Sequence, residues 1–234
     1  MAARSRIVTD HGTDCAALDW RHTGRFCGAA FGLDFANGMF FVALPYLALE
    51  FGADSMQLGA LTAWRGAAYV LACVPASMLS DRVNRKILLG CSTAGICLAF
   101  MAVALTSQFW QLCVLTVLWA LVISPLWPSL FSWLGDSHSP GQLRAATGAV
   151  NFSWSTGGMF GVLISGWMFG VSKSMPFLCA VVPAILACTL MVRSRCDHGR
   201  PKPVKQVQPV VGAKRELASV WLSNVAVCSL LGLM

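Results

Sequence analysis

The chain has 234 residues, of which 56% are hydrophobic and only 12% are charged, and its formal net charge is +7. Soluble domains carry about 25% charged residues, so this composition excludes an ordinary soluble protein. The mean hydropathy of +0.66 indicates a protein embedded in a lipid bilayer.

Residues 1–25 form a polar segment with no apolar stretch near its start, and Asp10, Asp14 and Asp19 lie within it. A secretory signal needs an apolar stretch, and transit peptides are poor in acidic residues. The sequence therefore predicts a cytoplasmic N-terminal tail.

Six long apolar segments follow the tail. Each is about the length that crosses a hydrocarbon core of ~30 Å at 1.5 Å per residue. Membrane barrel strands alternate polar and apolar residues, and these segments do not. The sequence therefore predicts an all-α polytopic membrane protein with a six-helix transmembrane bundle at residues 26–192. The expected helices are 26–49, 57–79, 87–106, 109–131, 145–168 and 174–192.

The last part of the chain divides into two segments. Residues 193–217 are basic and rich in proline, which disfavours regular structure, so we expect a cytoplasmic linker. Residues 218–234 are apolar and are expected to begin a seventh helix, truncated at Met234. The sequence therefore suggests a truncated or fragmentary chain.

The positive charges predict the orientation, because Lys and Arg are retained on the cytoplasmic side of short loops. With a cytoplasmic N-terminus, nearly all of the 17 basic residues fall in inner segments; Lys173 lies outside and Arg65 within a helix. This bias accounts for the net charge, so no nucleic-acid partner is expected. We expect an integral protein of the plasma (inner) membrane.

The loop between the second and third predicted helices carries a charged motif, SMLSDRVNRKILLG, at residues 77–90. It resembles the loop signature of the major facilitator superfamily, G-x-L-a-D-R-x-G-R-K-x-x-L. The residues that fall on this signature are Ser77, Leu79, Ser80, Asp81, Arg82, Asn84, Arg85, Lys86 and Leu89. Ser77 and Asn84 replace its two glycines. Because asparagine tolerates the left-handed backbone conformation, we expect Asn84 to adopt it in a tight turn.

The resemblance covers residues 26–234 and implies the amino-terminal half of a transporter made of two six-helix halves. In that architecture a small-molecule substrate, with or without a coupling proton or ion, moves by alternating access between the halves. The partner would be a missing C-terminal half or a second copy of the chain. The resemblance also implies that Asp81 ties the inner end of the second helix to the neighbouring half. A six-helix assembly or regulatory subunit without transport of its own remains the alternative.

Two ionisable residues, Asp34 and Arg65, lie deep in predicted helices, where a charge is expensive and marks a functional site by default. Asn37 stands one turn after Asp34 on the same helix face. We expect Asp34 and Arg65 to interact. Two interpretations stay open: the three side chains line the substrate path, or the two charges form a buried pair that fixes the first two helices together.

The fifth predicted helix adds two candidates for the substrate path, Asn151 and Ser153. Such side chains also hydrogen-bond between helices without touching a substrate. Small residues at close spacing are expected to bring this helix near a neighbour: Gly148, Gly157, Gly158, Gly161 and Gly166. In the fourth helix, Pro125 and Pro128 predict a kink.

No enzyme activity is expected from this sequence. Intramembrane hydrolysis needs a nucleophile with a base, yet no predicted helix contains histidine, and Asp34 is the only acid deep within one. The histidines and cysteines show no metal-ligand spacing. We therefore predict no catalytic residue, no metal and no cofactor.

Overall fold

The computed structural model of the protein describes residues 20–193, apart from the side chains of residues 81, 82 and 140. Every regular element in this range is helical, which confirms the all-α prediction. The helices are α1 (Trp20–Glu50), α2 (Ser55–Arg82), α3 (Arg85–Ala104), α4 (Phe109–Ile123), α5 (Leu126–Ser137), α6 (Pro140–Val171) and α7 (Met175–Val192). The predicted linker at 193–217 and the predicted helix at 218–234 lie outside the described residues, except for Arg193.

Each predicted transmembrane segment is helical, with α4 and α5 together occupying the fourth. Four stretches in the described range are long and apolar enough to cross a membrane: α1, α3, the α4–α5 pair and α7. The helices α2 and α6, with 28 and 32 residues, are also long but are not among these four. These two helices border the site described below.

The predicted kink in the fourth segment is confirmed as a break between α4 and α5 at Ser124 and Pro125. The Ser124 hydroxyl donates to the Leu121 carbonyl at 2.9 Å. Pro128 lies in the first turn of α5, where a missing N–H costs nothing, because first-turn amides have no partner within the helix. The break therefore comes from Pro125.

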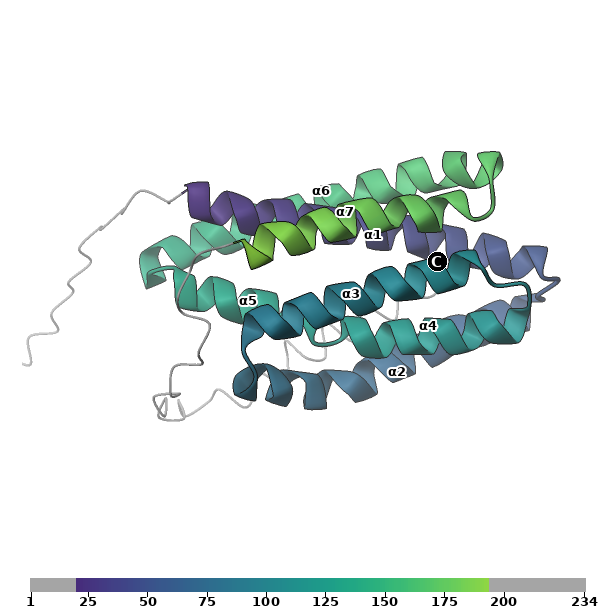
Figure 1. The fold of residues 1–234 in the computed structure, drawn as a ribbon, viewed down its shortest axis with the longest axis horizontal. Coiled ribbons are helices and arrows are strands. Elements are labelled where there is room, and N and C mark those ends of the chain that lie inside the picture. Colours follow the sequence, from purple (N-terminus) through teal and green to yellow (C-terminus); the bar gives the residue numbers. More distant parts are fainter. Residues whose placement is uncertain (1–19, 194–234) are drawn as a thin grey trace, which may run out of the picture. The chain divides into compact units, whose positions relative to one another are not determined.

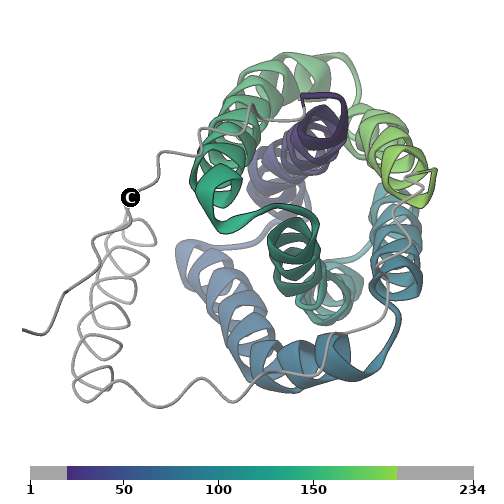
Figure 2. The same ribbon diagram turned by 90° about the vertical axis from the view of Figure 1, so that its left-hand side faces the viewer.

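The helices pack in two groups, α1 with α6 and α7, and α2 with α4 and α5, joined through α3 (Figure 1). The first membrane segment contacts the fifth and sixth, and the fourth contacts the second and third. This correspondence is typical of transporters built from internal structural repeats. Viewed along the helices, α2 and α6 flank one side of the group, with α1 and α5 set back between them (Figure 2).

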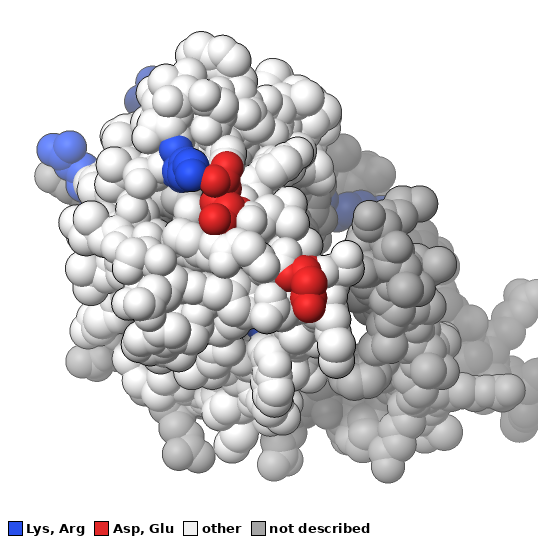
Figure 3. Space-filling model, turned by 90° about the vertical axis from the view of Figure 1, so that its right-hand side faces the viewer, with Lys and Arg blue, Asp and Glu red and all other residues white. Residues whose placement is uncertain are grey.

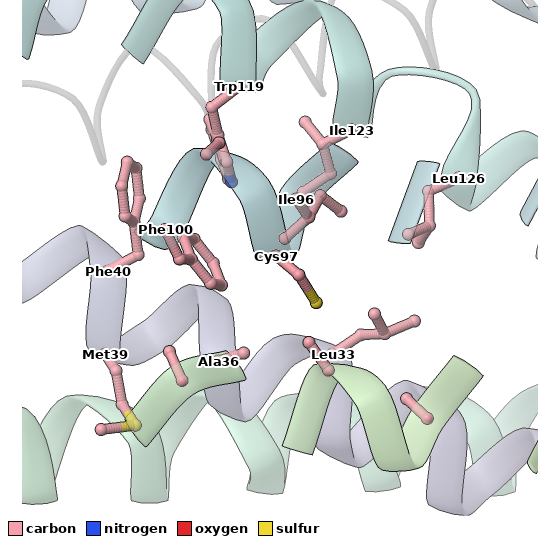
Figure 4. Packing of buried hydrophobic residues seen from close by; sticks show 14 of the residues in the cluster. Leu33, Ala36, Met39, Phe40, Ile96, Cys97, Phe100, Trp119, Ile123 and Leu126 are labelled. Carbon is pink, nitrogen blue, oxygen red and sulfur yellow. The ribbon is translucent and has the colours of Figure 1, made fainter. Parts of the chain in front are cut away.

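The core lies where α1 faces α3 and α4 (Figure 4). Phe40 of α1 stacks on Trp119 of α4 with ring centroids 4.9 Å apart and contacts Phe100 of α3 at 5.1 Å. All three side chains are almost fully buried. Aromatic contacts of this kind add about 0.5–1.5 kcal/mol beyond the area they bury, so they fix the position of α1 within the bundle.

Glycines bring α1 and α6 into close contact. A Cβ atom added at Gly157 or Gly161 would lie less than 3.0 Å from backbone atoms of α1, and one at Gly158 equally close to an α1 side chain. Within a membrane, small residues of this kind allow helices to pack by direct backbone contact. Gly148 and Gly166 have nothing within 4 Å, so the prediction of close packing is confirmed for three glycines and wrong for these two.

The loop between α2 and α3 contains only Val83 and Asn84. The backbone of Asn84 has φ −59° and ψ 120°, so the expected left-handed conformation is wrong. Asn84 is instead the N-cap of α3, and its side chain accepts a hydrogen bond from the Lys86 N–H at 3.0 Å. An N-cap needs a non-helical backbone and a side-chain acceptor, and Asn supplies both without positive φ.

Candidate functional site

Asp34 lies half-buried on α1, next to α6. Its Oδ2 atom lies directly against Gly158, where any side chain would collide with it. The side chains of Trp154, on α6, and Asn37, on α1, are within hydrogen-bonding reach of the carboxylate. The glycine on α6 thus leaves room for a charged group in the helix interface.

Asn37 is only 3% exposed, and its Oδ1 atom has no hydrogen-bond partner within the described part of the chain. An unpaired buried acceptor costs about 1–3 kcal/mol. One helical turn separates it from Asp34, so two acceptor groups occur together on α1.

Two indole rings pack against each other next to Asp34. Trp154 of α6 and Trp127 of α5 have ring centroids 4.9 Å apart with an interplanar angle of 34°, and Phe131 follows Trp127 at 6.4 Å. Trp154 is exposed and Trp127 is half-buried. The carboxylate therefore lies beside an aromatic surface that joins α5 and α6.

Arg65 of α2 is half-buried, and its Cζ atom lies 4.6 Å from the ring centroid of Phe41 on α1. Phe41 also packs edge-on against Trp119 at 5.4 Å. Because seven residues are two helical turns, Phe41 and Asp34 share one face of α1. The cation and the carboxylate thus lie on the same side of α1 at different depths.

The predicted interaction of Asp34 with Arg65 is wrong. Among the side chains that the structure describes, Arg85 pairs with Asp136 and Lys173 with Glu50, and neither Asp34 nor Arg65 takes part in an ion pair. The physical reason is distance along α1: seven residues correspond to about 10 Å, and the Arg65 side chain reaches the level of Phe41 and stops there.

We define the charged face as the exposed and half-buried side chains that surround these two charges on four helices. They are Asp34, Phe41, Arg65, Trp127, Asn151 and Trp154. Asn151 precedes Trp154 by almost one turn of α6 and is exposed. The face therefore contains three of the five predicted path residues, Asp34, Arg65 and Asn151, and Asn37 is buried behind it.

Ser153, the fifth candidate, does not join the charged face. Its hydroxyl donates to the Cys27 carbonyl of α1 at 2.9 Å, and the Ser165 hydroxyl likewise donates to the Met39 carbonyl at 2.8 Å. Both serines thus hydrogen-bond α6 to α1, at two different levels along the helices. The interhelical interpretation of Ser153 is the one that the geometry supports.

The loop motif is joined to α5 through a buried ion pair that the sequence reasoning missed. Arg85, 5% exposed, binds Asp136 near the end of α5. Lys86 lies above the Trp133 ring, with Nζ 5.7 Å from its centroid. Asp136 falls beyond the predicted end of the fourth helix, so no sequence pattern placed it opposite this loop.

The other motif residues have local roles. The Ser77 hydroxyl donates to the Val74 carbonyl at 2.8 Å, and the Ser80 and Ser129 hydroxyls hydrogen-bond to each other at 3.0 Å between α2 and α5. Leu79 is exposed. The side chains of Asp81 and Arg82 lie outside the described residues, and their roles stay predictions.

The opposite end of the bundle carries the α1–α2, α3–α4 and α6–α7 turns. Its surface is largely uncharged apart from a few acidic and basic side chains (Figure 3). Glu50 and Lys173 pair there at 2.5 Å, both well exposed. This pair lies away from the charged face and offers charges for use as controls.

The Major Facilitator Superfamily profile matches residues 26–234, which is most of the chain. The chain belongs to this superfamily. The loop motif, the six membrane segments and the internal correspondence of their contacts agree with this membership. The chain has no significant match among curated protein sequences.

Solved structures of superfamily transporters share the fold. A crystal structure of the peptide transporter POT in complex with sulfate has a TM-score of 0.70 at 19% identity, and covers 90% of this chain and 45% of the transporter. A mutant of that transporter in complex with alafosfalin gives 0.69 at 20% identity, covering 89% and 46%. A POT family transporter in complex with a thioalcohol-conjugated peptide gives 0.68 at 14% identity, covering 90% and 46%. This superfamily chain therefore spans about half the length of the transporters it resembles.

Proposed function

We propose that the chain is one half of a secondary transporter that moves a small solute by alternating access, with the charged face as its side of the solute path. One observation carries this proposal: a carboxylate and a guanidinium lie on one face between α2 and α6 without pairing with each other. Superfamily membership supplies the context, because transporters of this type bind their solutes between two halves.

The cost of charge in lipid supports this assignment. An Asp or Arg at the centre of a lipid-facing helix costs ~2.5–3.5 kcal/mol on insertion scales, so such residues face a water-filled path or a protein partner. The two helices that flank the charged face, α2 and α6, are also the two long helices outside the four stretches that are apolar enough to cross a membrane. Both features are expected of a surface in contact with water and a second half.

The proposed partner is a second six-helix half, or a second copy of this chain. The proposed orientation places the N-terminus and the α2–α3 loop in the cytoplasm of a cell with the protein in its plasma membrane. The Arg85–Asp136 pair then fastens the inner ends of α3 and α5. A coupling proton or ion would share the path through Asp34, the acid on the charged face.

The test is solute accumulation in inside-out membrane vesicles from cells that make the chain together with its natural partner. The vesicles are incubated with a cell extract, and their contents are compared by mass spectrometry. We expect at least one solute to accumulate with the wild type and not with Asp34→Asn, while Glu50→Gln leaves accumulation unchanged. Identical contents with and without Asp34 would reject the proposed path and favour an assembly or regulatory subunit.

A further inference from the structure

We propose that the charged face binds a zwitterionic solute, with the solute's amine at Asp34 and its carboxylate at Arg65. This inference rests on the proposed function, because it assigns a substrate class to the same site. It follows from the separation of the two charges. The fold keeps them apart, although pairing them would lower the free energy of burying each one.

The separation is maintained by packing. Arg65 lies on the Phe41 ring at 4.6 Å, and Asp34 lies against Gly158 two turns away along α1. Neither forms an ion pair with another side chain that the structure describes. A half-buried charge without a counter-charge is costly. A solute that brings one charge of each sign neutralises both residues at once, which a simple cation or anion cannot do.

The surroundings of Asp34 suit an ammonium group. An ammonium has three donors, and the oxygens of the half-buried Asp34 carboxylate on α1 can accept from it. The Trp154 and Trp127 rings, tilted by 34° to each other, lie beside the carboxylate, and indole faces attract cations. Acceptors and aromatic faces therefore converge where the amine would bind.

The surroundings of Arg65 suit a carboxylate. The Phe41 ring covers one side of the guanidinium group and holds it at a fixed depth. The planar edge of a guanidinium carries the N–H groups that bind a carboxylate with two parallel hydrogen bonds. A ring on one side leaves that edge available.

The spacing sets the size of the solute. Seven residues of helix place the two levels about 10 Å apart. One hydrogen bond of about 2.8 Å at each end leaves roughly 4 Å or more between the amine and carboxylate of the solute. The two groups of an α-amino acid lie closer together than that, so an α-amino acid is too short and an ω-amino acid with a chain of four to six carbons fits.

The experiment measures binding to the full 234-residue chain in lipid nanodiscs by isothermal titration calorimetry. Four probes are used: ε-aminocaproate, which carries both charges at the required separation; hexylamine and hexanoate, which each keep one; and free glycine, whose charges are too close. We expect ε-aminocaproate to bind at least tenfold more tightly than the other three probes.

Two substitutions test which residue recognises which end. Asp34→Asn should make ε-aminocaproate bind no more tightly than hexanoate, because the amine is no longer recognised. Arg65→Gln should make it bind no more tightly than hexylamine, because the carboxylate is no longer recognised. Asp34→Glu keeps the charge and should keep the selectivity, which covers the case in which Asp34→Asn does not fold. The matched controls Glu50→Gln and Lys173→Gln remove charges from the exposed outer pair and should change nothing.

Equal affinity for ε-aminocaproate and either singly charged probe would overturn the inference, and so would the absence of binding by all four. A selectivity that survives both substitutions would also overturn it. The proposed function fails separately: if vesicles accumulate a solute that lacks one of the charges in an Asp34-dependent manner, transport stands and the zwitterion is wrong. Selective binding of ε-aminocaproate without Asp34-dependent accumulation would support the zwitterion and reject the proposed transport.

Discussion

At the scale of single residues, two ion pairs among the described side chains lie in very different surroundings. The side chains of Arg85 and Asp136 are 6% and 24% exposed, and those of Lys173 and Glu50 are 59% and 43% exposed. Breaking a buried pair leaves an uncompensated charge, whereas an exposed pair is already screened by solvent. Loss of the Arg85–Asp136 pair should therefore lower the free energy of unfolding more than loss of the Lys173–Glu50 pair.

Asp136→Asn is expected to lower the free energy of unfolding by about 3–5 kcal/mol, because Arg85 remains buried without its partner. Glu50→Gln is expected to cost less than about 1 kcal/mol. Denaturant unfolding in detergent, followed by circular dichroism, measures both. Equal losses would mean that the Arg85–Asp136 contact does not stabilise this end of the bundle.

Asp34 and Arg65 make a different prediction, because they do not contact each other. The destabilisation caused by Asp34→Asn and by Arg65→Gln should add in the double variant to within about 0.5 kcal/mol. The same unfolding measurement on the two single variants and the double variant completes the cycle. An interaction energy above about 1 kcal/mol would show that the two charges pair in solution.

The sequence alone predicted which residues carry charge inside the membrane segments, but not their partners. Asp34 and Arg65 stand out because few charges interrupt the apolar runs. That Arg65 would bind the Phe41 ring depends on the packing of α1 against α2 and α4, which no local pattern records. Asn84 shows the same limit: its residue type fits both a left-handed turn and an N-cap, and only the backbone distinguishes them.

At the scale of helices, the α1–α6 contact depends on glycines at defined positions. Gly157 and Gly161 meet the backbone of α1 near Phe31 and Phe35, while Gly166 faces open space. All three occur in one run of small residues, so the sequence predicts a close contact without telling which glycine makes it. The rotation of α6 about its own axis decides this.

Gly161→Ala is expected to destabilise the bundle by about 1–3 kcal/mol, because the added methyl group overpacks a backbone contact. Gly166→Ala is the matched control on the same helix, and it should be neutral or should stabilise the helix by up to about 1 kcal/mol. Thermal unfolding of the two variants in detergent measures the difference. A loss at Gly166 as large as that at Gly161 would contradict the described rotation of α6.

The bounds of the helices illustrate what hydropathy can and cannot define. The fourth predicted segment ended at residue 131, but α5 continues to Ser137, and α6 begins at Pro140 before the predicted start at 145. Both extensions carry polar or charged side chains at the membrane surface, where a helix persists after the apolar run ends. Hydropathy located the membrane crossings, and helix-terminal residues such as Pro140 determine where the helices begin.

At the scale of the whole molecule, the charged face requires something to cover it. It lies between α2 and α6 on one side of the helix group, and the chain spans about half the length of the transporters it resembles (Figure 2). We predict that residues 1–234 alone, reconstituted as a monomer in liposomes, do not accumulate the solute identified in the vesicle experiment. Accumulation should appear when the second half is added, and accumulation by the monomer would contradict the half-transporter assignment.

The charged face should meet water while the exposed faces of α3 and α7 meet lipid, and thiol labelling in native membranes measures this difference. Single cysteines are introduced into a chain whose own cysteines are replaced by alanine, as Phe41→Cys and Asn151→Cys on the charged face and as Leu98→Cys and Val182→Cys on α3 and α7. Phe41, Leu98 and Val182 are 40%, 66% and 60% exposed, so exposure alone favours labelling of the last two. We predict that a charged, membrane-impermeant maleimide labels positions 41 and 151 and spares 98 and 182. Labelling of all four positions, or of 98 and 182 alone, would contradict it.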